Sequence, residues 1–547
     1  MWDTLLCLID YRTEQEISGI GKWMEVKKKT DNTLEKTMER EAVVTVNKEH
    51  FGYDIHSLLK AFYPEKNIRC VFGEEEKKED ISKGEEFASF LFHETGAEVS
   101  LEGESFSWKN LSGKGMESKG YKALFGSFLY QTLCTHTGRR LPWGSLIGIR
   151  PTKIAYTFLE EGKSEEEILE IYKNDRFVSE KKARLGIEIA AREREILKVV
   201  EHTEKVSVCG VRKEQDPHGF TKGYSLYIGI PFCPTTCLYC SFTSFPIASY
   251  RKLAENYIDC VIKEMEFTAD RFKDKILDSV YIGGGTPTTL EPEQLDRLLR
   301  RLKSLFDFST VKEFTVEAGR ADSITEEKLQ VLQKYGVSRI SINPQTMKQE
   351  TLDVIGRKAS VEQVLQAYEL ARSLKFDNIN MDIILGLPGE TAEDVKYTTD
   401  RIAELAPDSL TVHSLATKRA SALNQWIREH GMSALNNTEE TMEIASGAAK
   451  KMGMNPYYLY RQKNMSGNLE NVGYAKPGKY GLYNILIMEE VQTIAALGAG
   501  TVTKMVLPDG RIERCDNVKD VKLYMDQIDE MIERKRRLYC VLFSHKI

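Results

Sequence analysis

Three cysteines grouped within eight residues are the part of this sequence best suited to chemistry. Cys233, Cys237 and Cys240 are separated by three and then two residues. Pro231 and Pro234 restrict the conformation of the loop that carries them. Thiolates held close together on one restricted loop can bind a single inorganic centre, and we refer to these three residues as the cysteine triplet.

Two kinds of metal centre compete for the cysteine triplet. A structural zinc ion takes four ligands. The candidates for a fourth, Cys209, His218 and Cys260, do not lie at the paired spacing of zinc sites. Three thiolates suit a 4Fe–4S cluster with one iron left open, because cysteine thiolates are the normal ligands of such clusters. We therefore expect a 4Fe–4S cluster, with zinc or ordinary buried cysteines as the alternatives.

A glycine run and four polar side chains follow the triplet along the chain. Gly283, Gly284 and Gly285 match neither a P-loop nor a dinucleotide-binding fingerprint, but consecutive glycines let the backbone approach a ligand closely. The polar side chains are Glu317, Gln345, Arg357 and Asp382. Any one of them could be solvated or could cap a helix. Charged groups buried together are costly unless paired, so the set favours a ligand site.

Strands and helices alternate in the region that must position these residues. The predicted strands cover 224–230, 277–285, 311–319, 338–343, 378–389 and 408–415, with a predicted helix between each pair. This alternation is typical of a parallel α/β barrel or open sheet. Every residue singled out above lies at or after the carboxyl end of a strand, where parallel barrels carry their functional residues.

Composition and charge exclude several classes of protein. The chain has 547 residues and a net charge of −6, which argues against a general nucleic-acid binder. Ten cysteines are too few for a disulfide scaffold. No apolar run approaches the length of a membrane span, and the acidic N-terminus is unlike a signal peptide. We expect a cytoplasmic protein with no membrane span and no nucleic-acid partner.

The motifs resemble those of a known family. C-x3-C-x2-C after a first barrel strand, with Tyr239 just before the third cysteine, resembles the radical S-adenosylmethionine (radical SAM) superfamily. The ordered motifs YIGIPFC, GGGTPT, VEAGR, SINPQT, GRKAS, DIILGLPGE and LGAGT resemble the oxygen-independent coproporphyrinogen III oxidase family, over roughly residues 224–503. YDIHSLLKAFYP and GIRPTK extend the resemblance, which is strongest to the HemZ type, over most of 45–540.

This resemblance implies an α/β fold, a partial parallel (β/α)6 radical SAM barrel with an N-terminal α+β domain and a C-terminal α/β extension. From the composition and patterning along the chain we expect a mobile extension over 1–41, an N-terminal domain over 42–210 and a linker over 211–223, followed by the barrel over 224–415 and a substrate-covering domain over 416–547. The weakly patterned extension leaves Met38 as one candidate for the native start.

The resemblance also implies a reaction. A radical SAM oxidoreductase, coproporphyrinogen dehydrogenase, converts two propionates of coproporphyrinogen III to vinyl groups, giving protoporphyrinogen IX for heme biosynthesis. A 5′-deoxyadenosyl radical, made from S-adenosylmethionine at a 4Fe–4S cluster, starts the reaction. The implied cofactors are the cluster and one or two molecules of S-adenosylmethionine. The implied partners are the tetrapyrrole substrate and a low-potential electron donor such as flavodoxin or ferredoxin.

Site residues are carried over by motif. Cys233, Cys237 and Cys240 would ligate the cluster. Residues implied to surround S-adenosylmethionine are Tyr227, Gly284, Gly285, Thr286, Glu317, Gln345, Arg357, Asp382, Gly498 and Ala499. The substrate carries four carboxylates, so we expect basic side chains at its site. The candidates by position are Arg320, Lys358, Lys418, Arg419, Arg461 and Lys476.

One departure from the family pattern leaves alternatives open. The well-studied oxidases have a fourth cysteine two places after the third, where this chain has Phe242. This ending looks more like the heme-chaperone branch, whose members bind heme. A heme-trafficking protein, or a radical SAM enzyme acting on another tetrapyrrole, therefore stands beside the oxidase as an alternative.

Overall fold

The fold comes from a computed structural model of the chain. It describes residues 41–72, 85–148, 150–203, 216, 218–416, 422–431, 435–462 and 468–543. The predicted extension (apart from residue 41), part of the predicted linker, and Lys418 and Arg419 lie outside this description. None of the described helices combines the length and apolarity needed to cross a membrane.

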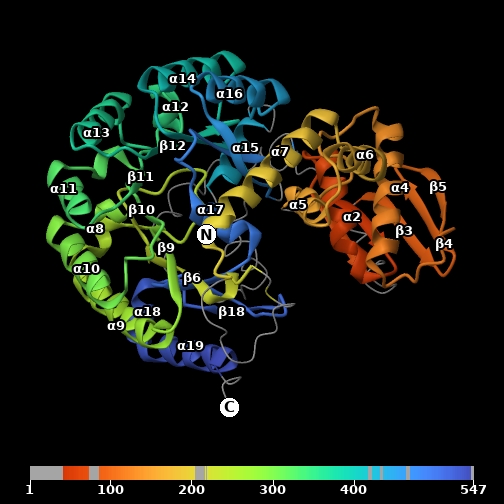
Figure 1. Cartoon of the computed structure of the whole chain (residues 1–547). Coiled ribbons are helices and arrows are strands. Elements are labelled where there is room, and N and C mark those ends of the chain that lie inside the picture. The colour runs from red at the N-terminus through yellow and green to blue at the C-terminus, as the bar shows by residue number, and fades with distance from the viewer. Residues whose placement is uncertain are drawn as a thin grey trace, which may run out of the picture.

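Six parallel strands form the centre of an eleven-stranded sheet (Figure 1). They are β6 (Gly223–Ile230), β9 (Ile276–Gly284), β10 (Glu313–Glu317), β11 (Arg339–Ser341), β12 (Ile379–Leu385) and β13 (Ser409–Ser414). Each pairs in parallel with the next one along the chain. The six strands expected from the sequence are therefore confirmed, and so is the α/β fold class.

Helices between these strands cover the outer face of the curved sheet (Figure 1). The main ones are α9 (Ala254–Phe272), α10 (Pro292–Leu305), α11 (Glu326–Lys334), α13 (Val361–Ser373) and α14 (Ala392–Leu405). Reciprocal side-chain caps at Ser360 and Thr391 begin α13 and α14, so each helix start is specified locally. Leu295, Leu298 and Leu302 of α10 are spaced to lie on one helix face, and all three are buried in the core.

Segments from the C-terminal part of the chain extend the sheet at both edges. β16 (Thr493–Leu497) pairs in parallel with β6, and β17 (Val502–Val506) and β18 (Ile512–Asp516) follow it. At the other edge β15 (Asn471–Ala475) runs antiparallel to β13, with β14 (Asn455–Tyr460) outside it. The six-stranded barrel is therefore open, because β6 and β13 each have another neighbour. The boundary drawn at residue 416 stays a prediction.

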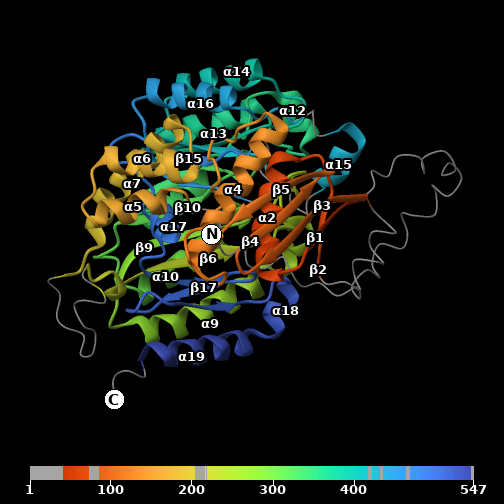
Figure 2. The same ribbon diagram turned by 90° about the vertical axis from the view of Figure 1, so that its right-hand side faces the viewer.

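The N-terminal part divides between two hydrophobic cores. Strands β2 (Ile68–Phe72), β1 (Ala42–Val46), β3 (Glu85–His93), β4 (Gly96–Leu101) and β5 (Glu104–Lys109) form a separate sheet in that order. This sheet shares a core with α2 (Glu49–Phe62) and α4 (Lys119–Thr137), beside the barrel (Figures 1 and 2). Helices α5 (Thr152–Glu160), α6 (Glu165–Arg176) and α7 (Glu180–Leu197) instead pack into the barrel's core. The single domain over 42–210 stays a prediction.

A buried polar network joins the helices before the barrel to its far edge. Lys182 on α7 pairs with Glu470 at 2.5 Å, and the side chains of the two residues are 4% and 0% exposed. Trp143 Nε1 donates to the same carboxylate at 2.7 Å. The next residue, Asn471, accepts a hydrogen bond from the backbone N–H of Ser414 at the end of β13. The network therefore reaches a strand end that borders the candidate site.

Candidate functional site

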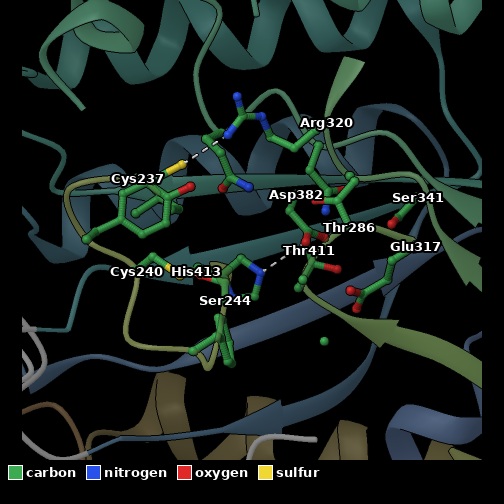
Figure 3. A pocket seen from close by; sticks show the side chains of 18 of the residues that line it. Cys237, Cys240, Ser244, Thr286, Glu317, Arg320, Ser341, Asp382, Thr411 and His413 are labelled. Carbon is green, nitrogen blue, oxygen red and sulfur yellow. Dashed lines mark hydrogen bonds and ion pairs between the residues drawn. The ribbon is translucent and has the colours of Figure 1, made fainter. Parts of the chain in front are cut away.

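A cavity of about 200 Å³ opens at the carboxyl ends of the parallel strands. Its floor is made of polar side chains at alternating strand positions, where they share one face of the sheet. These pairs are Thr315 and Glu317, Arg339 and Ser341, Asn380 and Asp382, and Thr411 and His413. The three cysteines of the triplet also line the cavity, and Cys237 and Cys240 lie together on one side of it (Figure 3).

All three cysteines of the triplet line this cavity. Burial raises the pKa of the Cys233 thiol to about 11 and also raises that of Cys240, and repulsion from Cys237 acts in the same direction on both. Isolated thiols of this kind would stay protonated at neutral pH, whereas metal ligation deprotonates a coordinating thiol. The environment therefore suits thiols whose charge is taken up by a bound cation.

Each sulfur of the triplet has a hydrogen-bonding neighbour, and those of Cys233 and Cys237 come from distant segments of the chain. Cys233 Sγ lies 3.5 Å from Thr286 Oγ1, and Cys240 Sγ lies 3.7 Å from Ser244 Oγ. Cys237 Sγ accepts a hydrogen bond from Arg320 at 3.6 Å (Figure 3). Such neighbours orient metal ligands and tune the centre they hold.

The donor set of the triplet fits an iron–sulfur cluster better than a single ion. In the described part of the chain, no three His, Cys, Asp or Glu side chains are placed to hold one metal ion. A 4Fe–4S cluster does not need such convergence, because each cysteine binds a different iron atom of the cluster. The three cavity-facing thiols could therefore hold this group, with the rest of the cavity beside it.

The glycine run ends β9 and bends beside the cysteine loop, and we call this bend the glycine turn. Gly284 has a φ of +105°, which side-chain-bearing residues rarely adopt. A Cβ on Gly285 would lie 2.6 Å from the carbonyl oxygen of Phe232, the residue before the first cysteine. The backbone N–H of Thr286 donates to that same oxygen at 2.7 Å. Glycine therefore lets the turn and the cysteine loop pack backbone to backbone.

Glu317 lies at the end of β10, across the cavity from Cys237 and Cys240 (Figure 3). Burial raises the pKa of its carboxyl to about 7, and repulsion from Asp382 adds to the effect. The hydroxyl of Tyr281 donates to Glu317 at 2.5 Å and partly offsets the rise. A carboxyl with this pKa changes its charge near neutral pH, so its ability to accept hydrogen bonds from a ligand depends on pH.

Asp382 is held in its ionised form. Burial by itself would raise the pKa of this carboxyl, but His413, Asn380 and Thr411 together bring the pKa below its usual value. His413 Nε2 lies 3.6 Å from Asp382, and Asn380 Nδ2 donates to Asp382 at 2.7 Å. The two cavity carboxyls therefore differ, since one is ionised and the other titrates near pH 7.

Three polar side chains at the end of β11 and on the loop after it have atoms without a hydrogen-bond partner in the described structure. Ser341 Oγ, Asn343 Oδ1 and Gln345 Oε1 are buried and make no hydrogen bond within the described structure, and all three residues line the cavity. Gln345 also has a φ of +68°, a strained backbone conformation of the kind that clusters at ligand sites. Buried polar atoms without partners are costly. They fit a polar ligand that supplies the missing hydrogen bonds.

Arg357 lines the cavity while bridging three loops. Its guanidinium donates to the carbonyl oxygens of Gly319 and Asn343, and to the Tyr239 hydroxyl at 3.4 Å. Tyr239 belongs to the cysteine loop, so Arg357 ties that loop to the ends of β10 and β11. Most of its donors are used within the protein, which makes it a brace for the cavity wall.

The structure brings most of the predicted cofactor residues to one cavity. Those that line it are Gly284, Gly285, Thr286, Glu317, Gln345, Arg357 and Asp382. Tyr227 lies behind the cavity wall and stacks on Tyr281, with the ring centres 6.1 Å apart. Gly498 and Ala499 also lie outside the lining and bond to Glu264 and Tyr257 of α9. A role of all these residues in binding S-adenosylmethionine stays a prediction.

The predicted substrate residues are more scattered. Arg320 lines the cavity. Lys358 is exposed outside the cavity, and Lys476 also lies outside it, where it donates to the carbonyl of Ala406. Arg461 is buried at the joint with the N-terminal helices, where it donates to Leu146 and Asn468. Of the candidates that the structure describes, only Arg320 therefore faces the cavity.

Several cavity residues were not singled out from the sequence. They are Tyr281, Thr315, Arg339, Ser341, Asn343, Asn380, Thr411 and Tyr458. A usable signal existed for those on strands, because polar residues alternate with apolar ones in FTVE, RISIN and NMDI. Fully buried strands otherwise consist of near-continuous apolar residues, so polar residues at every second position indicate a polar interior.

Comparison with known proteins places this site in a family context. The profile of the Radical SAM superfamily matches residues 227–402. The oxygen-independent coproporphyrinogen-III oxidase-like protein HemZ of Bacillus subtilis is 40% identical over 414 residues, which cover 75% of this chain and 79% of HemZ.

Two further comparisons concern proteins of different activity. The heme chaperone HemW of Bacillus subtilis is 31% identical over 309 residues, covering 56% of this chain and 76% of HemW. Among solved structures, the coproporphyrinogen III oxidase HemN of Escherichia coli aligns with a TM-score of 0.46 at 22% identity, covering 62% of this chain and 72% of HemN.

Proposed function

This chain belongs to the oxygen-independent coproporphyrinogen-III oxidase-like family of the radical SAM superfamily, and from that premise we propose that it decarboxylates coproporphyrinogen III oxidatively to protoporphyrinogen IX. The observation that carries the proposal is one polar cavity. There the cysteine triplet faces Glu317, Asp382 and the unpartnered atoms of Ser341, Asn343 and Gln345. Members of the superfamily use a 4Fe–4S cluster and S-adenosylmethionine, and this cavity offers ligands for both.

The bound cofactors would supply a 5′-deoxyadenosyl radical that removes a hydrogen atom from the β-carbon of a propionate. This chain's residues would prepare that step. The triplet would hold the cluster, and the glycine turn would let backbone approach S-adenosylmethionine. Ser341, Asn343 and Gln345 would supply hydrogen bonds to its polar groups. We propose one molecule of S-adenosylmethionine for each of the two propionates.

The overall change at each propionate is the loss of one hydrogen atom, one electron and carbon dioxide. The electron passes to a one-electron acceptor, and the vinyl double bond forms as the carboxylate leaves. A separate low-potential donor such as flavodoxin or ferredoxin would reduce the cluster. Arg320 is not available to the substrate's four carboxylates, because it uses its donors within the protein.

One anaerobic assay tests this proposal. Reconstituted protein is mixed with dithionite, S-adenosylmethionine and coproporphyrinogen III, and chromatography follows 5′-deoxyadenosine and the tetrapyrrole. We expect both 5′-deoxyadenosine and protoporphyrinogen IX. 5′-Deoxyadenosine without a changed tetrapyrrole would contradict the proposed substrate and direct the search to heme or another tetrapyrrole.

A heme-trafficking role is the second candidate, because HemW is 31% identical and Phe242 replaces the fourth cysteine of the studied oxidases. Titration of the protein with heme, followed by gel filtration, separates the two candidates. A stable one-to-one heme complex in a protein that leaves coproporphyrinogen III unchanged would favour trafficking over the oxidase.

A further inference from the structure

Arg320, which the sequence analysis gave as a substrate candidate, donates hydrogen bonds to the cysteine loop instead. It follows β10, and only 3% of its surface is exposed. Its Nη1 donates to the carbonyl of Thr235 at 3.2 Å and to Cys237 Sγ at 3.6 Å. Its Nε and Nη2 face Asp322 at 3.0 and 2.7 Å. The guanidinium therefore lies between one acidic side chain and one cluster cysteine.

Arg320 differs from the other hydrogen-bonding neighbours of the triplet. Thr286 and Ser244 approach Cys233 and Cys240 with neutral hydroxyl groups. Arg320 alone among these three neighbours is a cation. A hydrogen bond from a cation to a thiolate is roughly twice as strong as one between neutral groups. In this buried position its charge is also poorly screened by solvent.

We propose that Arg320 is a positioning residue that acts through Cys237 to raise the reduction potential of the cluster. The inference rests on the proposed function, because it takes the triplet to be the cluster's ligands. Reduction adds one electron to the cluster and makes it more negative. A fixed cation and donor beside one thiolate stabilise that state. Asp322 opposes this effect, because its carboxylate pairs with the same guanidinium.

A purely structural role for Arg320 makes a different prediction. Through Thr235 the side chain also braces the cysteine loop, since Nη2 donates to Thr235 Oγ1 at 3.1 Å. If bracing were its whole effect, loss of either Arg320 or Asp322 would disturb the loop in the same direction. An electrostatic effect instead requires the two substitutions to shift the potential in opposite directions.

The test is a redox titration of the reconstituted cluster, followed by electron paramagnetic resonance without substrate. We expect Arg320→Gln to reduce the equilibrium constant for cluster reduction at least tenfold, which is about 59 mV for one electron. Arg320→Lys should shift the potential less, because it keeps the charge and loses the planar fork. Asp322→Asn should shift the potential in the positive direction.

One control variant isolates the effect. Arg372→Gln removes a comparable arginine that pairs with Asp408 at 2.7 Å, away from the cavity, and should leave the potential unchanged. A negative shift in both Arg320→Gln and Asp322→Asn, or no shift in either, would overturn the proposal. If Arg320→Gln assembles no cluster, Arg320→Lys and Asp322→Asn decide the matter. Failure of the wild-type protein to hold any cluster would instead contradict the proposed function.

Discussion

At the scale of single residues, two carboxyl groups in the cavity differ in pKa because their surroundings differ. Asp382 has three polar neighbours that keep its pKa low, whereas Glu317 is buried with one strong hydrogen bond and a pKa of about 7. The charge of the cavity therefore changes within the physiological pH range. The ionised form of Glu317 is the stronger hydrogen-bond acceptor, because both oxygens then accept and neither donates, so ligand binding should follow its titration.

We predict that the affinity for S-adenosylmethionine rises roughly tenfold between pH 6 and pH 8, as Glu317 ionises. Glu317→Gln should weaken binding at pH 8 by about tenfold or more, since it loses a charge-assisted hydrogen bond. It should also flatten the pH profile. Equilibrium dialysis of the cluster-loaded protein measures both effects. A wild-type slope preserved in Glu317→Gln would remove this residue from the binding site.

The raised pKa of Glu317 also makes the stability of the fold depend on pH in a defined direction. The folded-state pKa of Glu317 is raised above its unfolded value, so its contribution to stability is complete below about pH 4.5. That contribution is lost as the pH rises through about 7. Urea unfolding of the protein without cofactors should therefore show Glu317→Gln gaining stability relative to the wild type between pH 5 and pH 8. A constant difference over this range would contradict the assigned pKa.

Replacing any one cysteine of the triplet tests the cluster assignment. Cys233→Ala, Cys237→Ala and Cys240→Ala should each lose the iron–sulfur absorbance and the bound iron, because three ligands are the minimum for this centre. Cys260→Ala is the matched control, since Cys260 is a half-buried thiol on α9 outside the cavity. It should keep both signals. Full iron content in a triplet variant would show that another residue is the ligand.

Only part of the candidate site could be predicted from residue types. The triplet, Glu317 and Asp382 were predicted because their spacing and strand-end positions are local features. The substrate roles of Arg320 and Arg461 were predicted from charge and position alone. Two partners of these arginines are distant in the sequence, because Arg320 also bonds to Thr235 and Arg461 to Leu146 through the packing of separate segments. No local pattern distinguishes a basic side chain that faces a ligand from one that serves as a brace.

At the scale of elements, the glycine turn after β9 and the cysteine loop after β6 behave as one unit. Two consecutive backbone N–H groups, of Gly285 and Thr286, donate to the carbonyls of Ile230 and Phe232. The position of Cys233 therefore depends on the close approach of two backbones. A side chain at the point of contact must push these loops apart, because the neighbouring atoms belong to the backbone.

We predict that Gly285→Ala destabilises the protein by about 1–3 kcal/mol and reduces cluster incorporation, since its Cβ would lie 2.6 Å from the Phe232 carbonyl. Gly447→Ala is the control. Gly447 lies in helix α16 (Glu439–Lys451), and a Cβ there would meet no atom within 4 Å. That substitution should stabilise the protein by about 0.5–1 kcal/mol. Urea unfolding and iron content compare the two, and equal effects would rule out the contact described.

The order of strands and helices in the barrel was predictable. The pairing of the outer strands with the barrel's two edges was not. Strand–helix alternation is a local pattern, so all six parallel strands could be predicted. The pairing of Ile494 with Ser225 joins residues that are far apart in the sequence. β16 has the composition of any buried strand, so nothing within it indicates β6 as its neighbour. For the same reason the antiparallel edge formed by β14 and β15 could not be anticipated.

At the scale of the whole molecule, helices α5 to α7 belong physically to the barrel although they precede it in the chain. Their apolar residues share its core, and Lys182 reaches Glu470 across the joint. A buried ion pair contributes little when intact, but the loss of one partner leaves a charge buried without compensation. The joint is therefore sensitive to single substitutions.

We predict that Lys182→Met lowers the free energy of unfolding by about 3 kcal/mol or more, because it leaves the buried Glu470 carboxylate without its cation. The adjacent residue supplies the control. Lys181 pairs with Glu443 on the surface, and both side chains are 58% exposed. Lys181→Met should change stability by less than about 1 kcal/mol. Similar losses in the two variants, measured by urea unfolding, would show that the buried pair has no special role.

The pairing of β16 with β6 also has a consequence for folding during synthesis. β6 leads directly into the cysteine loop, but its neighbour on one side, β16, ends only at Leu497. A nascent chain emerging from the ribosome therefore presents an unpaired strand edge next to its cysteines while more than two hundred further residues are translated. Exposed edges of this kind invite association with other chains. Translation as far as Leu497 thus determines when β6 gains this neighbour.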